Sequence, residues 1–233
     1  MSVRQRAIGV VLNVFFPPRC VNCRERGNWL CTTCLAVAKR LPAAHCRRCA
    51  IPSMGVAICP RCWRDPPSFD QISCAFLFEG PIRTAIHALK YRGARHLAEP
   101  LVEAALAELT VPAADLIVPV PLFASRFAER GYNQSSLLAD AVGRRVGTPI
   151  VEVGLRRIRD TPAQVSLPAA ERWQNVNGAF AAESSLVGQR SVLLVDDVAT
   201  TGNTLRAASE ALKRGGARQI HVLIVARTAS HSP

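Results

Sequence analysis

Residues 191–205 read Ser-Val-Leu-Leu-Val-Asp-Asp-Val-Ala-Thr-Thr-Gly-Asn-Thr-Leu. The run Val192–Val195 contains only valine and leucine, which is typical of a strand buried on both faces of a parallel sheet. Two carboxylates, Asp196 and Asp197, follow it directly. An amphipathic run begins after Asn203 and predicts a helix. The stretch therefore predicts a buried strand that ends in two acids, a short loop and the start of a helix.

The loop between this strand and this helix predicts an anion site. The first N–H groups of a helix have no intrahelical partner and carry partial positive charge, so a phosphate fits there. Gly202 lets a ligand approach the backbone closely, and we expect the hydroxyl of Thr204 to cap the helix. The expected donors to the phosphate are the N–H groups of 200–204, and the expected binding residues of the loop are Ala199, Thr200, Thr201, Gly202, Asn203 and Thr204.

The two acids predict a second part of the same site. Carboxylates at a strand end, here Asp196 and Asp197, accept hydrogen bonds from a vicinal diol such as that of ribose. We therefore predict a ribose 5-phosphate site and assign the catalytic role to both acids. The pattern resembles the phosphoribosyl-pyrophosphate (PRPP) motif of type I phosphoribosyltransferases, and a βα turn with acids by chance is the alternative. A Walker B strand is disfavoured because the sequence contains no Gly-x-x-x-x-Gly-Lys.

Eight of the nine cysteines form four Cys-x-x-Cys pairs near the start of the chain. Each pair presents two sulfurs to one tetrahedral ion, and two pairs complete a Cys₄ site. We predict two structural Zn²⁺ sites made by Cys20, Cys23, Cys31, Cys34, Cys46, Cys49, Cys59 and Cys62. Sequential pairing costs the least loop closure entropy, an interleaved pairing stays open, and disulfides are the alternative. We expect Trp29 and Trp63 to fill the core of this module.

The cysteines also predict two parts of the chain, residues 1–66 with an N-terminal helix and the zinc module, and residues 67–233 with an α/β domain. The first part holds eleven Lys and Arg against two acidic residues, so it carries +9 of the net charge of +12. Two zinc-thiolate sites lower its charge to about +5, which still suits a nucleic-acid surface. Arg47, Arg48 and the cluster 61–64 are candidate phosphate contacts, and base stacking is the alternative role of Trp29 and Trp63.

No run of 18 or more apolar residues occurs, so we expect no membrane insertion. The apolar run 7–16 follows two arginines, as in a signal peptide, but Pro17-Pro18-Arg19-Cys20 stands where a cleavage site would be. We expect a helix that packs on the domain. Reduced, metal-binding cysteines predict a cytoplasmic location.

A second strand, loop and helix are predicted from Asp115–Val120 onward. The equivalent loop of phosphoribosyltransferases holds pyrophosphate, and by this resemblance Arg126, Arg130 and the backbone of Gly131 are its candidate ligands. A short strand is expected at Pro149–Val153.

A polar segment without an obvious buried face runs from Leu155 to Gly178 and contains Arg156 and Arg159. We predict that this segment is a lid whose arginines assist at the pyrophosphate. A solvated loop is the alternative.

Several motifs together resemble the ComF/GntX family, the competence protein F group. The resemblance rests on the cysteine module, the acid-pair loop, and the motifs Leu-Lys-Tyr-Arg-Gly (89–93), Pro-Val-Pro-Leu (119–122), Arg-Gly-Tyr-Asn-Gln (130–134), Arg-Asp-Thr-Pro-Ala-Gln (159–164) and Glu-Arg-x₂-Asn-Val-x-Gly-Ala-Phe (171–180). It implies a type I phosphoribosyltransferase fold, with a Rossmann-like and mostly parallel sheet, behind a double zinc ribbon.

The resemblance also implies a function. We expect a protein that binds Mg²⁺-PRPP or another ribose 5-phosphate ligand and handles single-stranded DNA in the cytoplasm during natural transformation. DNA-uptake or recombination proteins are its candidate partners. The alternative is an active phosphoribosyltransferase in nucleobase salvage or nucleotide metabolism, in which the arginines stabilise the departing pyrophosphate.

Overall fold

The structure is a computed structural model that describes residues 17–53, 55–159 and 178–229. The expected N-terminal helix and most of the expected lid lie outside these residues. The elements in chain order are α2 (Thr32–Ala36), α3 (Pro60–Arg64), β1 (Gln71–Leu77), α4 (Gly80–Tyr91), η1 (Arg95–Leu97), α5 (Ala98–Glu108), β2 (Leu116–Pro119), α6 (Ala124–Arg130), α7 (Gln134–Val146), η2 (Glu152–Gly154), β3 (Leu155–Arg157), β4 (Phe180–Ala182), α9 (Ser184–Val187), β5 (Ser191–Ala199), α10 (Asn203–Arg214) and β6 (Gln219–Arg227).

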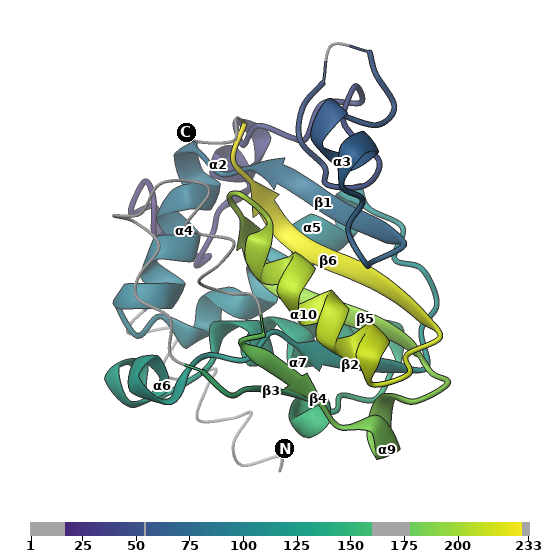
Figure 1. The fold of residues 1–233 in the computed structure, drawn as a ribbon. Helices are drawn as coiled ribbons and strands as arrows, with labels where there is room; N and C mark the ends of the chain where they lie inside the picture. Colours follow the sequence, from purple (N-terminus) through teal and green to yellow (C-terminus); the bar gives the residue numbers. More distant parts are fainter. Residues whose placement is uncertain (1–16, 54, 160–177, 230–233) are drawn as a thin grey trace.

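Four parallel strands form the central sheet, in the order β1-β6-β5-β2 (Figure 1). Because the strands are parallel, their carboxyl ends lie along one edge, where ligands bind in open α/β sheets. The predicted α/β fold with a parallel sheet is confirmed. No helix in the described part of the chain combines the length and the hydropathy that a membrane span requires.

Side chains that alternate along β5 divide the core into two layers. Leu193 and Val195 pack in a cluster with α4, α5 and α7, whereas Val192 and Leu194 pack with α10 and the β3–β4 hairpin. Figure 1 shows α10 in front of the sheet and α5 behind it. The sheet is therefore covered on both faces, as the apolar run of β5 predicts.

The chain between the two cysteine groups covers the β1 edge of the sheet. The N–H of Leu41 donates to the carbonyl of Ala75 at 2.8 Å, and the N–H of Leu77 donates to the carbonyl of Lys39 at 2.8 Å. An edge strand paired in this way offers fewer free groups to another chain. The first cysteine group also shares the apolar cluster of α4 and α5, and the domain boundary near Asp65 stays a prediction.

The opposite edge differs from the expectation. A strand was expected at Pro149–Val153, but only Ile150 bridges β2, through Ile117, and η2 follows. Two further elements were not expected. Residues 124–130 form the helix α6 within the predicted loop, and residues 155–157 form β3, which pairs antiparallel with β4.

The tryptophans of the cysteine module do not fill its core, so that expectation was wrong. Trp29 is 40% exposed and Trp63 is 79% exposed. The ring of Trp29 lies against the ring of His96, with 3.8 Å between the centroids. The clustered cysteines, rather than aromatic packing, form the interior of this module.

Candidate functional site

The ribose-phosphate loop, residues 199–204, joins β5 to α10 at the carboxyl edge of the sheet. Gly202 occupies the N-cap position with φ 78°, a left-handed conformation that glycine adopts without strain. Its carbonyl accepts the N–H of Arg206 at 3.0 Å. The expectation that Thr204 caps the helix was wrong, because Thr204 already lies inside α10. The tight turn brings the first N–H groups of α10 beside the end of β5.

The two acids lie within β5, which runs on to Ala199 in pairing with β6 instead of ending at the acids as expected, and both are buried. Asp196 is 8% exposed and Asp197 is 2% exposed. The Asp196 carboxylate accepts hydrogen bonds from the Ser135 hydroxyl at 2.8 Å and from the N–H of Asp197 at 2.9 Å. Oδ1 of Asp197 accepts the N–H of Val198 at 2.7 Å, and Oδ2 lies 2.7 Å from Nζ of Lys90. The acids therefore belong to a charged network with α4 and α7.

Burial raises the pKa of the Asp196 carboxyl to about 7, and repulsion from Asp197 adds to this effect. Lys90 and the Ser135 hydroxyl act in the opposite direction. Burial lowers the pKa of Lys90, but the attraction of Asp197 outweighs it, so this pKa lies above its ordinary value. Lys90 is therefore stabilised as a cation within the network, and the Asp196 carboxyl loses its proton at a higher pH than an ordinary aspartate.

A hollow of about 170 Å³ lies beside this ion pair. Its lining residues are Lys90, Tyr91, Gly93, Glu129, Arg130 and Tyr132. The Arg130 guanidinium lies over the ring of Tyr91, 4.9 Å from the centroid, and donates to Oε1 of Gln134 at 2.7 Å. Lys90 and Arg130 give the hollow positive charge, which suits a phosphate or pyrophosphate group.

The structure brings only part of the predicted pyrophosphate loop to this hollow. Arg130 lines it, and Gly131 follows with φ 72° at the end of α6. Arg126 lies on α6 but is not among the lining residues. Of the predicted set, only Arg130 lines the hollow, together with Lys90; Gly131 lies in the chain between the lining residues Arg130 and Tyr132.

The lid arginines do not line the hollow either. Arg156 on β3 forms an ion pair with Glu183 at 3.1 Å, and Arg159 is the last residue described before the gap at 160–177. Their role at the pyrophosphate stays a prediction.

The eight paired cysteines form two groups with the geometry of zinc sites. The groups are sequential, Cys20, Cys23, Cys31 and Cys34 in one and Cys46, Cys49, Cys59 and Cys62 in the other, and the sulfurs of each lie within 4.8 Å of one another. Cys20 and Cys34 have sulfurs 3.7 Å apart, and Cys49 and Cys59 have sulfurs 3.8 Å apart. A tetrahedron with Zn–S bonds of about 2.3 Å places its sulfurs about 3.8 Å apart. The residues therefore fit structural Zn²⁺.

The ninth cysteine, Cys74, lies on β1 outside both groups and is buried. Burial raises the pKa of its thiol to about 12. It is a core residue, as expected, and not a thiolate nucleophile.

Sequence reasoning missed three residues of the site. Lys90 appears in the sequence analysis only within the motif Leu-Lys-Tyr-Arg-Gly (89–93), and no sequence pattern indicates Ser135. Arg61 reaches the ribose-phosphate loop from the second cysteine group and donates to the carbonyl of Thr201 at 2.8 Å. The two residues are 140 positions apart, so no local pattern reveals the contact.

Two family models match the chain. One, described as a phosphoribosyl transferase domain, matches residues 132–232, and the other, described as a double zinc ribbon domain, matches residues 11–63.

Similar proteins match nearly the whole chain. Competence protein F of Haemophilus influenzae is 33% identical over 229 residues, which cover 91% of this chain and 98% of that protein. DNA utilization protein YhgH of Escherichia coli (strain K12) is 32% identical over 226 residues, with the same two coverages. The protein of that name from Salmonella typhi is 31% identical over 224 residues, again covering 91% and 98%.

We predict about two Zn²⁺ per chain in the purified protein, because two Cys₄ groups are preformed. Cys49→Ser should lower the zinc content to about one ion, whereas Cys74→Ser, which changes a cysteine outside both groups, should leave it at about two. Elemental analysis measures this content. Metal-free protein with oxidised cysteine pairs would contradict the zinc assignment.

We also predict a pH effect from Asp196. Its folded pKa of about 7 lies above its ordinary value of 3.8, so between these values the native state binds more protons than the unfolded state. The free energy of unfolding should therefore fall as pH rises through this window, by at most about 1.4 kcal/mol per pH unit.

Asp196→Asn removes this titration. In urea unfolding of zinc-loaded protein without ligand, the free energy of unfolding of the variant minus that of wild type should increase as pH rises from about 5 to about 8. Protons taken up when zinc is released on unfolding affect both proteins equally, so they do not contribute to this difference. A difference that stays constant over this range would show that Asp196 does not titrate there.

Proposed function

Because the chain belongs to the competence protein F (ComF) family, we propose that its phosphoribosyltransferase domain binds Mg²⁺-PRPP or another ribose 5-phosphate ligand. We propose further that the protein handles single-stranded DNA in the cytoplasm during natural transformation, with DNA-uptake or recombination proteins as partners.

The observation that carries the first proposal is the arrangement at the end of β5. Asp196 and Asp197 lie in the last four residues of β5, which leads through Thr200 and Thr201 to the left-handed turn at Gly202, at the carboxyl edge of a parallel sheet. Backbone N–H groups of the turn suit the 5-phosphate, and the carboxylates suit the ribose hydroxyls.

Burial of the acids defines how the ribose would bind. Each carboxylate oxygen accepts more than one hydrogen bond, so the diol would use acceptor sites beside those occupied by Ser135 and Lys90. The Lys90 ammonium, paired with Asp197, would lie between the ribose and the hollow at Arg130.

The hollow at Lys90 and Arg130 is the proposed place of the pyrophosphate. Lys90 and Arg130 both line the hollow and would attract the negative charge of the pyrophosphate, and Glu129 would supply a carboxylate oxygen of the kind that Mg²⁺ prefers. Mg²⁺, when bound, would neutralise part of the pyrophosphate charge. Arg156 and Arg159 would join from the lid.

An active phosphoribosyltransferase in nucleobase salvage is the second candidate, favoured by the joint presence of the acid pair, Lys90 and Arg130. In such a reaction the bond between ribose C1 and the pyrophosphate oxygen breaks, its electron pair leaves with pyrophosphate, and a nucleobase nitrogen forms the new bond to C1. Positively charged groups at the hollow would stabilise the leaving group.

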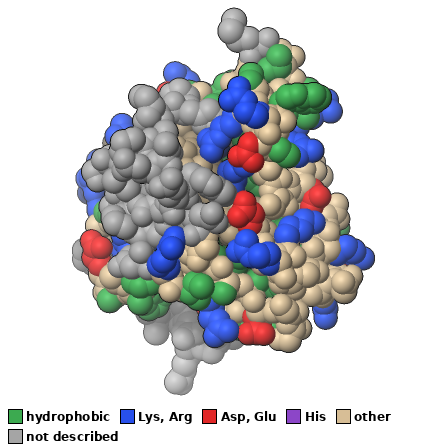
Figure 2. Space-filling view, viewed as in Figure 1, with side chains coloured by type: hydrophobic (Ala, Val, Ile, Leu, Met, Phe, Trp, Pro, Cys, Tyr) green, Lys and Arg blue, Asp and Glu red, His purple; other side chains and the backbone are tan. Residues whose placement is uncertain are grey.

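A cleft beside the second cysteine group supports the DNA proposal. It measures about 580 Å³, and its lining residues are His45, Arg47, Arg48, Ala57, Ile58, Asp70, Gln71 and Ile72. Trp63 nearby in sequence is 79% exposed and offers a ring for base stacking. In Figure 2, Lys and Arg side chains are spread over the face that carries α10, interspersed with single acidic side chains.

We predict that Asp197→Asn and Gly202→Ala each weaken Mg²⁺-PRPP binding about tenfold or more, because one removes a charged acceptor and the other adds a side chain in the phosphate turn. Gly216→Ala is the matched control, since Gly216 is also left-handed (φ 87°) but follows the far end of α10. It should leave the affinity unchanged.

Calorimetric titration measures these affinities, and ribose 5-phosphate separates the turn from the pyrophosphate hollow. A folded, zinc-loaded wild type that binds neither ligand would refute the proposed site. Equal losses at Gly202 and Gly216 would indicate a general effect of backbone strain.

For DNA, we predict that affinity for a single strand falls steeply with salt, and that Arg47→Glu with Arg48→Glu lowers the slope by roughly 0.7 for each lost phosphate contact. The double change Arg24→Glu with Arg26→Glu, at exposed positions of the first cysteine group, should not lower it. Equal effects of the two pairs would mean that the cleft is not the DNA surface. Fluorescence anisotropy over a salt series provides the measurement.

A further inference from the structure

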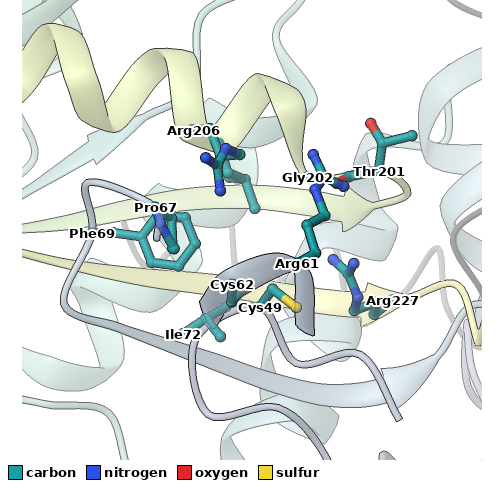
Figure 3. Close-up of a pocket in the computed structure, with 11 residues that line it drawn as sticks. Cys49, Arg61, Cys62, Pro67, Phe69, Ile72, Thr201, Gly202, Arg206 and Arg227 are labelled. Carbon is teal, nitrogen blue, oxygen red and sulfur yellow. The ribbon is translucent and has the colours of Figure 1, made fainter. Parts of the chain in front are cut away.

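Arg61 extends from the second zinc ribbon into the ribose-phosphate loop. It precedes the zinc ligand Cys62 on α3. Its guanidinium donates from Nη1 to the carbonyl of Thr201 at 2.8 Å and from Nη2 to Oδ1 of Asn203 at 2.7 Å. Figure 3 shows the Arg61 side chain reaching from α3 to the loop beside Gly202. The planar fork therefore spans both sides of the left-handed turn.

A second arginine joins the same two elements in the opposite direction. Arg206, on the first turn of α10 and 6% exposed, donates to the carbonyl of Asp65 at 2.9 Å and forms an ion pair with its carboxylate. Asp65 is the C-cap residue of α3. Helix α3 and the start of α10 are therefore joined by two arginines, Arg61 from α3 and Arg206 from α10.

The sulfur ligands of the second zinc site line this contact. Cys49 and Cys62 lie there with Arg61, Arg206 and Arg227 (Figure 3). A Zn²⁺ ion with four thiolates carries a net charge of about −2. The loaded zinc site therefore adds negative charge at the place where the three guanidinium groups gather, and buried charges require such compensation.

The bond to Thr201 also orients a group that the phosphate would use. The peptide between Thr201 and Gly202 is trans, and in a trans peptide the N–H points opposite to the carbonyl. Because Arg61 holds the carbonyl, the N–H of Gly202 is directed away from α3. Arg61 thereby fixes the orientation of one donor in the ribose-phosphate loop.

We infer that the second zinc site, acting through Arg61, is a positioning element for the ribose-phosphate loop. Loss of that zinc ion or of the Arg61 fork loosens the turn at Gly202 and the first turn of α10. This effect on the loop is expected in the protein without any ligand. A further consequence of loosening the turn, a weaker affinity for PRPP, rests on the proposed function.

The test is amide hydrogen exchange of the full-length, zinc-loaded protein without ligand, measured by NMR. The informative amide is that of Arg206, which donates to the carbonyl of Gly202. Arg61→Gln should retain about two Zn²⁺ and speed this exchange about tenfold or more, because charged hydrogen bonds are lost. Arg64→Gln, an exposed position on the same helix, is the control and should leave it unchanged.

Zinc is tested separately with two cysteine variants. Cys23→Ser and Cys49→Ser remove one ligand from the first and from the second site, and only Cys49→Ser should speed the exchange of the Arg206 amide. If Arg61→Gln loses the second zinc ion, Arg61→Lys takes its place, since it keeps the charge but lacks the fork.

Unchanged exchange in a zinc-loaded Arg61 variant, or equal acceleration by Cys23→Ser and Cys49→Ser, would overturn the inference. Titration of the same samples with Mg²⁺-PRPP separates it from the proposed function. If the wild type does not bind PRPP but the exchange pattern is as expected, PRPP is refuted as the ligand, and the positioning of the loop by the second zinc site through Arg61 is supported.

Discussion

Strand β5 has no polar face along Val192–Val195, and the architecture follows from this constraint. Its four side chains are at most 1% exposed, and each contributes on the order of 1.5 to 3 kcal/mol when buried. Covering both faces requires helices on both sides of the sheet, which α5, α7 and α10 provide. The same cover reaches the strand end, so the acids that follow are buried as well.

Burial of the acids makes their partners part of the site. An unpaired carboxylate in the core would be costly. Asp197 therefore forms an ion pair with Lys90, and Asp196 accepts a hydrogen bond from the Ser135 hydroxyl. These contacts join the ends of α4 and α7 to β5, just before the ribose-phosphate loop. The second zinc ribbon joins the loop from another direction through Arg61. The second zinc ribbon is thus in contact with the α/β domain where its ligand is proposed to bind.

Local patterns could be read from the sequence, and distant contacts could not. The buried strand, the acid pair and the zinc ligands depend on neighbouring residues or fixed spacing, and the structure has the strand and both cysteine groups where predicted. The cap at Gly202 was missed because residue type alone does not decide between a threonine cap and a left-handed glycine. Lys90 and Arg61 were missed because their partners lie far away in the sequence.

The most direct measurement of the central claim is a titration of isotope-labelled, zinc-loaded protein with ribose 5-phosphate, followed through backbone amide resonances. The account predicts saturable changes concentrated at Thr200–Thr204, whose N–H groups would bind the phosphate, and smaller changes near Lys90 beside the ribose. Saturable changes confined to another surface, or no change at these amides in a protein whose two zinc sites are filled, would contradict it.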